Sequence, residues 1–205
     1  MIQNKVIVIA GIIGSGKTEV CNILRTKGYS VYTLDEINEE LLLKKHVKNN
    51  LVKILGNFIL DDNMEIDKEV LSKIIFNNLS SRIKVEEFLH KEIMNNLTAK
   101  IKMKKNHKNN LLFVEIPLFF TKYDFIKEHI DIYKVWVLST DKDVCISRVK
   151  KRNNFSEDKI LKIMDLQYNN IDIEEPCVFF KNDKDLCALK QEVENAILME
   201  NNYER

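Results

Sequence analysis

The sequence has few of the residues that divide a chain into separate parts. Its 205 residues include only five glycines and two prolines, so the ends of helices and strands must be found from changes in the spacing of apolar residues. No Pro-, Gly- or Ser-rich linker interrupts the chain, and its length is sufficient for one well-formed hydrophobic core. We therefore expect a single domain over residues 1–205.

Excess charge and long apolar runs are also missing. Lys and Arg total 32 against 31 Asp and Glu, a formal net charge of +1, so no overall field would attract nucleic acid or an anionic membrane. No apolar run approaches the roughly 20 residues of a membrane-spanning helix, and the residues after Met1 lack the basic and apolar regions of a secretion signal. These absences predict a cytoplasmic protein with neither nucleic acid nor membrane as partner. They leave its oligomeric state open.

The four cysteines show no pattern typical of a metal site. Cys21, Cys145, Cys177 and Cys187 include no Cys-x-x-Cys pair and have no paired histidines beside them. This spacing disfavours both a zinc site and a disulfide framework. We expect them to be small buried side chains in a reducing cytosol.

Short runs of Val, Ile, Leu and Phe alternate with segments of helical periodicity. Such continuous apolar runs are typical of strands buried on both faces of a parallel sheet, and the alternation indicates an α/β fold. The predicted strands are residues 5–10, 29–34, 111–116, 133–139 and 177–181, with helices over residues 17–27 and about 185–199. The expected architecture is a three-layer α/β fold around a five-stranded parallel sheet.

Residues 36–110 contain no convincing strand pattern. Apolar residues recur there at three- and four-residue spacing, and the segment is too long for a single helix that joins two parallel strands. We expect an inserted helical lobe, which in a kinase would be the natural place to bind the phosphate acceptor.

Residues 11–18, GIIGSGKT, fit the phosphate-loop pattern G-x-x-x-x-G-K-[ST]. Glycine lets backbone N–H groups turn toward phosphate oxygens, Lys17 adds positive charge at the terminal phosphates, and the Thr18 hydroxyl would bind Mg²⁺. A glycine-rich turn could imitate the pattern, but here a predicted strand precedes it and an amphipathic helix follows, which favours a P-loop NTPase-type fold. The motif does not separate ATP from GTP. The predicted ATP-binding residues of the loop are Ile13, Gly14, Ser15, Gly16, Lys17 and Thr18.

A phosphate loop occurs in switches, motors and small-molecule kinases. The chain is short for a motor, and the guanine-recognition tetrad Asn-Lys-x-Asp of a switch is absent, since KNDKD at residues 181–185 lacks its register. These two absences favour a kinase.

Further motifs, taken in chain order, resemble the dephospho-CoA kinase family, whose members phosphorylate the ribose 3′-hydroxyl of dephospho-CoA. Besides GIIGSGKTEV, the matching segments are VYTLDEINEEL, LGNFILDDNMEIDKEVLSKIIF, FLHKEI, FVEIPLFF and VCISRVKKRNNFSEDKILKIMDLQ. Together they span nearly the whole chain. The sequence departs from the family pattern at Thr33, Met64, Lys68, Lys91, Thr121 and Cys177. Three of these, Met64, Lys68 and Lys91, lie in the acceptor lobe.

Two acidic residues are candidates for the chemistry. Asp35 follows a predicted strand at the sheet edge that carries the phosphate loop, where a carboxylate could accept the proton of an attacking hydroxyl. Capping of a helix that begins near residue 36 is the alternative, and the resemblance places the family's base at Asp35. Glu115 also ends a predicted strand and could orient Mg²⁺ through water.

Four further residues complete the predicted site. Arg148 and Arg152 would share one face of a helix, and the resemblance implies a short lid, about residues 145–160, in which they close over the transferred phosphoryl group. A solvated basic face would show the same spacing. The resemblance also implies that His90 lies in the acceptor lobe, where a purely structural role is equally compatible, and that Asn182 lies near the adenine.

The expected function is ATP-dependent transfer of a phosphoryl group to dephospho-CoA with Mg²⁺ as cofactor. Lys17, Asp35 and Arg152 are the expected catalytic residues, and Asp35 and His90 are expected to bind the acceptor. A nucleoside or nucleotide monophosphate kinase, and a nucleotide-binding module without turnover, are the alternatives that the sequence leaves open.

Overall fold

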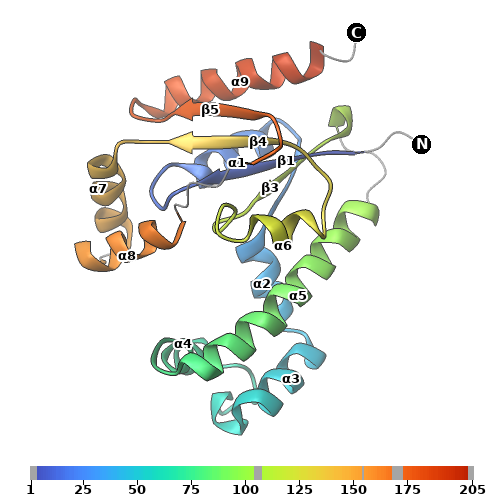
Figure 1. The fold of residues 1–205 in the computed structure, drawn as a ribbon, viewed down its shortest axis with the longest axis vertical. Coiled ribbons are helices and arrows are strands. Elements are labelled where there is room, and N and C mark those ends of the chain that lie inside the picture. The colour runs from blue at the N-terminus through green and yellow to red at the C-terminus, as the bar shows by residue number, and fades with distance from the viewer. Residues whose placement is uncertain (1–3, 104–107, 154, 168–172, 203–205) are drawn as a thin grey trace. The chain divides into compact units, whose positions relative to one another are not determined.

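The computed structural model describes residues 4–103, 108–153, 155–167 and 173–202 (Figure 1). The chain divides into two compact units, one built from residues 1–33 and 101–205 and the other from residues 34–100. The second unit corresponds to the predicted insertion over residues 36–110, although both of its ends lie earlier in the chain. That the two units form one domain stays a prediction. None of the described helices combines the length and hydropathy needed to cross a bilayer.

The first unit contains a parallel sheet with the strand order β2-β3-β1-β4-β5. The prediction of a five-stranded parallel sheet is confirmed, and the strand ends differ from the expected ones by one residue at most. Since β1 has neighbours on both sides and Val6 to Ala10 are buried, the loop that follows it begins at the centre of the sheet. The strands are β1 (Lys5–Gly11), β2 (Ser30–Thr33), β3 (Leu111–Glu115), β4 (Ile132–Ser139) and β5 (Cys177–Lys181).

Helices α1 (Lys17–Thr26) and α9 (Leu186–Asn202) share one hydrophobic cluster with the sheet. Phe113 of β3 and Trp136 of β4 lie in this cluster with their ring centroids 5.1 Å apart. The short elements η2 (Lys108–Asn110) and α6 (Tyr123–Lys127) lie in the chain before and after β3. Because the cluster includes residues of β1, β3, β4 and β5, it holds the strands that carry the functional loops in register.

Helices α7 (Lys142–Asn153) and α8 (Glu157–Gln167) follow β4 and correspond to the predicted lid over residues 145–160. In Figure 1 they form a hairpin beside the end of β4. They enclose a small hydrophobic cluster of their own, and Ile12 and Ile13 of the phosphate loop pack against it. The hairpin is therefore attached to the loop by apolar contacts. The buried members of the cluster are Cys145, Ile146, Val149, Ile160 and Met164.

The second unit is helical, as predicted. It comprises α2 (Leu34–Leu42), α3 (Lys45–Leu55), η1 (Asn57–Ile59), α4 (Lys68–Asn77) and most of α5 (Leu79–Met103). Every one of these helices except α4 contributes side chains that are at most 2% exposed. These include Ile37, Val47, Leu51, Ile59, Val85 and Leu97.

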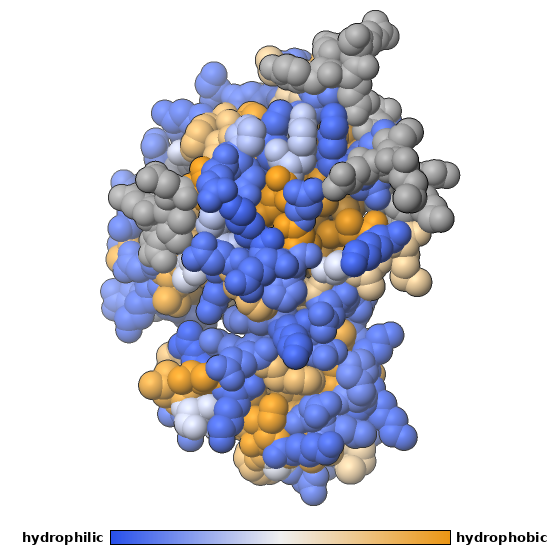
Figure 2. Space-filling view, turned by 45° about the vertical axis from the view of Figure 1, so that its right-hand side comes forward, coloured by the Kyte–Doolittle hydropathy of each residue, from blue (hydrophilic) through white to orange (hydrophobic). Residues whose placement is uncertain are grey.

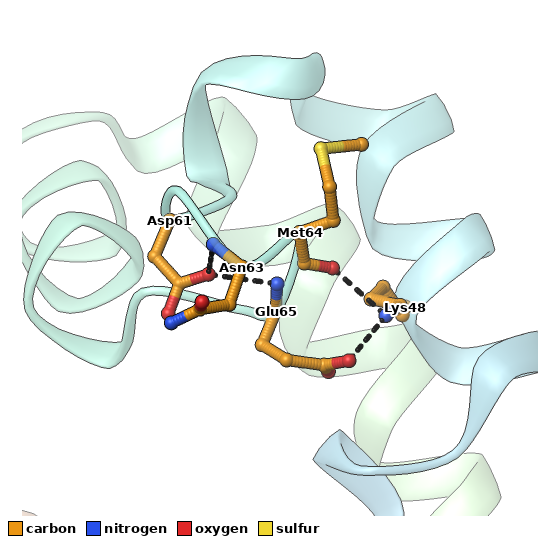
Figure 3. A network of polar contacts seen from close by, with 5 residues as sticks. All are labelled: Lys48, Asp61, Asn63, Met64 and Glu65. Atoms are coloured by element: carbon orange, nitrogen blue, oxygen red, sulfur yellow. Dashed lines mark hydrogen bonds and ion pairs between the residues drawn. The ribbon is translucent and has the colours of Figure 1, made fainter.

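A tight loop joins η1 to α4 and is held by polar contacts from both sides (Figure 3). One carboxylate oxygen of Asp61 accepts hydrogen bonds of 2.9 Å from the backbone N–H groups of Asn63 and Glu65. The Lys48 ammonium donates to the carbonyl of Met64 and to the carboxylate of Glu65, both at 2.8 Å. These bonds hold Met64 in a left-handed conformation, with φ of 62°, that side chains other than glycine rarely adopt.

The expectation of four buried cysteines is wrong for two of them. Cys21 and Cys145 are buried, whereas Cys177 is half-buried and Cys187 is exposed. Cys177 is the first residue of β5, which is the edge strand of the sheet and has a neighbour on one side only. Cys187 is the second residue of α9, before the turn whose side chains reach the core.

Candidate active site

The loop over residues 11–18 lies between β1 and α1, and Gly16 is essential to its shape. Gly16 has φ of 102°, a left-handed value that favours glycine. A Cβ at this position would also lie 2.2 Å from the side-chain nitrogen of Asn182. The loop therefore needs glycine here both for its backbone turn and for the approach of a neighbouring side chain.

Lys17 is buried beneath the loop, with 8% of its surface exposed. Its ammonium donates hydrogen bonds to the backbone carbonyls of Gly11 (2.9 Å) and Ile12 (3.2 Å). The ammonium also lies 3.8 Å from Oε1 of Glu115, a buried carboxylate at the end of β3. The structure thus brings two predicted residues together, from segments about a hundred residues apart, and their opposite charges stabilise each other where water is largely excluded.

Loops that follow β4 and β5 hold the middle of the phosphate loop. The carbonyl of Ser15 accepts hydrogen bonds from the Asn182 side-chain nitrogen (2.8 Å) and from the Thr140 hydroxyl (3.1 Å). Both donors are buried. The backbone N–H of Asp141 in turn donates to Asp183 (2.9 Å), and this bond, together with Lys181, holds the pKa of the Asp183 carboxyl below its usual value. The two loops are therefore tied to each other as well as to Ser15.

Asn182 is thus in contact with the phosphate loop, as a residue of the nucleotide site should be. Asn182 is only 6% exposed, and its side-chain nitrogen donates to the Ser15 carbonyl. The contact is therefore with the loop backbone. The predicted proximity to adenine stays a prediction. Thr140 makes the equivalent contact and was not predicted from the sequence, because a single threonine after a strand carries no distinguishing pattern.

A second residue that sequence reasoning did not assign is Gln167, the last residue of α8. Its Oε1 accepts a hydrogen bond of 2.6 Å from the backbone N–H of Ile13. Gln167 is 7% exposed and lies on the same helix face as the buried Ile160 and Met164. A long polar side chain on the apolar face of a helix was the available signal, since such a group must find a buried partner.

The two arginines of α7 have different surroundings. Arg148 is half-buried and its guanidinium donates to the carbonyl of Gly14 at 3.4 Å. Arg152 is exposed, and its Nε donates to the side chain of Asn153. They lie one turn apart on one helix, as expected. In this structure Arg148 alone of the two has a hydrogen bond to the loop, so the prediction that both reach one anion stays a prediction.

Asp35 lies in the second unit, and its local structure differs from both readings of the sequence. Strand β2 ends at Thr33, and α2 begins at Leu34, so Asp35 is neither the end of the strand nor the cap before the helix. It is an exposed residue in the first turn of α2. A carboxylate is favoured there by the helix dipole, which explains why the helix begins earlier than expected.

His90, the other predicted acceptor residue, is half-buried within α5. Asp35 and His90 both belong to the second unit, whereas the phosphate loop, Glu115 and the arginines belong to the first. The predicted site residues thus form two sets, each within its own unit.

The residues that could hold Mg²⁺ are Thr18 and Glu115. Thr18 is exposed in the first turn of α1, and Glu115 ends β3. The described residues contain no group of three or more His, Cys, Asp or Glu side chains able to bind a metal. Magnesium fits this arrangement, because it prefers oxygen ligands, retains several waters and is usually bound by one or two protein oxygens together with substrate phosphates.

Burial raises the pKa of the Cys145 thiol near the loop, which keeps this group neutral.

A central parallel sheet, a glycine-bearing loop around a buried lysine and a helix that begins at that loop define a P-loop nucleotide-binding protein. Solved structures of such proteins have this fold: a gluconokinase from Sinorhizobium meliloti superposes with a TM-score of 0.55 at 17% identity and covers 98% of this chain and 96% of its own. A dephospho-CoA kinase from Campylobacter jejuni superposes with a TM-score of 0.65 at 25% identity, covering 95% of this chain and 96% of its own.

The family follows from the sequence comparisons. The dephospho-CoA kinase family model matches residues 5–186. A dephospho-CoA kinase of Fusobacterium nucleatum is 30% identical over 192 residues, 92% of this chain and 95% of the relative. One from Wolinella succinogenes is 31% identical over 195 residues, 93% of this chain and 92% of the relative. The chain belongs to the dephospho-CoA kinase family, and the resemblance drawn from its motifs is confirmed.

Proposed function

We propose that this protein transfers the terminal phosphoryl group of ATP to the ribose 3′-hydroxyl of dephospho-CoA, giving coenzyme A and ADP. Membership of the family over residues 5–186 supports the reaction and both substrates. The observation that carries the proposal is the complete phosphate loop, with Lys17 buried beneath it 3.8 Å from Glu115. The loop, its lysine and the acidic residue beside them are the groups with which P-loop kinases bind a nucleoside triphosphate and Mg²⁺.

Lys17 and the loop backbone bind the phosphates in this proposal. The ammonium is held by two carbonyls and by Glu115, and it exchanges one of these contacts for an oxygen of the terminal phosphate. The N–H groups of Gly14, Ser15 and Gly16 and the N-terminus of α1 supply the remaining positive potential. Thr18 and Glu115 would hold Mg²⁺, directly or through water. Mg²⁺ bound there would neutralise negative charge that develops on the phosphates during transfer.

Asp35 activates the acceptor. Its carboxylate is exposed in the first turn of α2, so it is available to accept the proton of the 3′-hydroxyl as that oxygen attacks the terminal phosphorus. Transfer is direct and in line, with no phosphorylated enzyme intermediate. His90 contributes to acceptor binding within the same unit.

The lid arginines stabilise the transferred group. Guanidinium groups neutralise charge on the equatorial oxygens of a migrating phosphoryl group. Arg148 already donates to the Gly14 carbonyl and reaches the terminal phosphate from there. Arg152 reaches the same phosphate when α7 and α8 close over the nucleotide. This closure also excludes water from the site. We place the reaction in the cytoplasm, where ATP is supplied.

The test is ADP release by the purified protein with ATP and Mg²⁺, with dephospho-CoA offered beside a panel of nucleosides and nucleoside monophosphates. We expect turnover with dephospho-CoA, and a fall of about a hundredfold or more in kcat for Asp35→Asn with little change in the KM for ATP. Turnover only with a nucleoside or nucleoside monophosphate would show that this compound, and not dephospho-CoA, is the acceptor. ATP binding without turnover on any acceptor would show that the protein is a nucleotide-binding module and not a kinase.

A further inference from the structure

The turn that follows β3 carries a threonine whose hydroxyl reaches the lid hairpin. Residues 117–122 form this turn, between the end of β3 and α6. The Thr121 hydroxyl donates a hydrogen bond of 2.5 Å to the backbone carbonyl of Leu166, in the last turn of α8. Hydrophilic side chains cover most of the face in Figure 2, and helix-end carbonyls at such a surface can bond to water. At Leu166 the partner is a side chain instead, which fixes the end of the helix.

The Leu166 carbonyl and the Gln167 backbone nitrogen belong to one peptide group. Because that group is planar and includes the Gln167 Cα, a bond that fixes the carbonyl also fixes the atom from which the Gln167 side chain extends. Gln167 is the residue whose Oε1 accepts the Ile13 N–H at 2.6 Å. Helix ends fray, and a glutamine side chain loses much rotamer freedom when it is held. The bond to Ile13 therefore depends on a fixed end of α8, which Thr121 provides.

The turn is itself held by buried aromatic residues on either side of Thr121. Phe119 and Tyr123 are 1% and 4% exposed, and their ring centroids lie 5.7 Å apart. The Tyr123 hydroxyl donates to the Glu175 carboxylate (2.7 Å) and accepts from the Glu174 N–H (3.1 Å), in the segment that precedes β5. Because close-packed side chains hold the turn in place, the Thr121 hydroxyl is presented to α8 from a fixed part of the first unit.

Three consecutive residues of the phosphate loop have a backbone group bonded to a side chain from outside the loop. These bonds join Ile13 to Gln167, Gly14 to Arg148, and Ser15 to Asn182. Donors that bind an anion are most effective when they are already aimed at it. Loss of the bond at Ile13 would therefore let the loop leave the conformation in which its N–H groups converge on phosphate oxygens.

We infer that Thr121 is a positioning residue for ATP. Its hydroxyl holds the end of α8, Gln167 thereby accepts the Ile13 N–H, and the phosphate loop keeps the shape that binds phosphate. Thr121 is one of the positions at which the sequence departs from the family pattern, so that pattern assigns it no role. The inference rests on the proposed function for the identity of the nucleotide, and it makes a residue outside both the loop and the lid a determinant of ATP affinity.

The test is a double-mutant cycle in the full-length protein. Thr121→Val removes the hydroxyl and keeps the shape of the side chain, and Gln167→Leu removes the acceptor for Ile13. The KM for ATP is measured for each variant and for the pair, with dephospho-CoA saturating, and Thr121→Ser tests rescue by a retained hydroxyl. Thr26→Val is the matched control, because the Thr26 hydroxyl also donates to a helix carbonyl, that of Ile23 (2.7 Å), at the end of α1 farthest from the loop.

We expect the KM for ATP to rise about two- to fivefold in Thr121→Val, with kcat and the KM for dephospho-CoA unchanged. Thr121→Ser and Thr26→Val should match the wild type. In the Gln167→Leu background, Thr121→Val should have no further effect on the KM for ATP, because the side chain through which it acts is already gone. A purely structural role would lower the unfolding temperature equally in both backgrounds and leave the KM for ATP unchanged.

A wild-type KM for ATP in Thr121→Val, or the same rise in both backgrounds, would overturn the inference. If the wild type fails to phosphorylate dephospho-CoA, the proposed function is wrong, and calorimetric titration of the same variants with ADP and Mg²⁺ then decides the inference alone. A dissociation constant that Thr121→Val raises only when Gln167 is present supports it. Equal constants in the wild type and Thr121→Val, or absence of binding to the wild type, overturn it.

Discussion

The side chain of Gln167 accepts a hydrogen bond of 2.6 Å from the backbone N–H of Ile13. The last residue of α8 is therefore bonded directly to the phosphate loop, so the lid hairpin is attached to the loop at its C-terminal end. This bond joins the parts predicted to bind the donor and to close over it, and it gives the first of five predictions.

Replacement of Gln167 should change ATP binding more than it changes the fold. Gln167→Leu leaves the Ile13 N–H without its acceptor, and an unsatisfied buried donor costs roughly 1–3 kcal/mol, so we expect the KM for ATP to rise at least fivefold. Gln167→Glu retains an acceptor oxygen but places a negative charge near the phosphates, so its KM for ATP should fall as pH is lowered and the carboxyl is protonated.

Steady-state kinetics between pH 5 and 8 measure both effects. Leu166→Ala serves as control, because that side chain is exposed on the same helix turn. A wild-type KM for ATP in Gln167→Leu would show that the bond has no role in nucleotide binding.

Removal of the Lys17 charge should abolish transfer without unfolding the protein. Lys17→Met keeps most of the side-chain volume and leaves the carbonyls of Gly11 and Ile12 and the Glu115 carboxylate without their cation. We expect kcat to fall by a hundredfold or more, as found when a group that stabilises transition-state charge is deleted. Coupled ADP-release assays measure kcat, and thermal unfolding tests whether the fold persists. The additional replacement Glu115→Gln should recover stability, since it removes a buried negative charge that has lost its contact with Lys17, but should not recover activity.

Gly16 and Gly28 allow backbone strain to be separated from steric conflict. Both have positive φ, 102° and 82°, but a Cβ at Gly28 has no atom within 4 Å, whereas a Cβ at Gly16 would be 2.2 Å from Asn182. Gly28→Ala should therefore lower the free energy of unfolding by about 1–2 kcal/mol and leave activity intact. Gly16→Ala should cost more and should abolish ATP binding, because Asn182 must move from Ser15. Chemical denaturation and nucleotide titration of both variants provide the comparison, and equal losses would contradict it.

Replacement of Met64 by glycine should raise the free energy of unfolding. Its φ of 62° costs a residue with a Cβ roughly 1 kcal/mol, and glycine avoids this cost. Met64→Gly should raise the free energy of unfolding by up to about 0.5 kcal/mol after the greater flexibility of glycine in the unfolded chain, which costs roughly 0.5–1 kcal/mol, is subtracted. Asp61→Ala, which removes the two bonds to Asn63 and Glu65, should lower it. Urea denaturation measures both, and a loss of stability in Met64→Gly would show that the Met64 side chain has a stabilising contact.

The hydrogen bond and the ion pair of Asp183 should make the free energy of unfolding depend on pH in the acidic range. The Asp183 pKa is lowered in the folded protein by the bond from the Asp141 N–H and by Lys181, so the folded state binds the proton less readily than the unfolded state. The stabilisation is therefore present above the ordinary aspartate pKa and is lost as pH falls through the lowered value. Asp183→Asn should be less stable than the wild type at pH 7, and the difference should shrink below about pH 4. A difference that is constant from pH 7 to pH 3 would contradict this account.

The parts of the fold that were predictable are those with local signals. Strands β1 and β3 are continuous apolar runs, and the loop with Lys17 has a fixed spacing of glycines, so both could be located from the sequence. Glu115 could be found because it ends a recognisable strand, and the structure places it 3.8 Å from Lys17. Each of these signals lies within about ten consecutive residues.

The parts that were not predictable depend on contacts between distant segments. Gln167 and Thr140 matter because of the loop backbone they reach, and neither has a sequence pattern that identifies this contact. Asp35 was expected at the end of a strand, but only four residues of β2 pair with β3, and helix formation begins directly afterwards. The pocket lined by Asn38, Phe76 and Leu89 requires the packing of α2, α4 and α5, which periodicity alone does not specify.

The hydrogen bond from Asn182 to Ser15 joins residues that are 167 positions apart. During synthesis the phosphate loop emerges well before β5 and the Asn182 that follows it, whose side chain donates to the Ser15 carbonyl. Contacts of such long range form late and slow the folding reaction. A nascent or truncated chain that ends before β5 should therefore carry the whole GIIGSGKT motif but lack the bond from Asn182 to Ser15, and should bind ATP more weakly than the chain that includes β5.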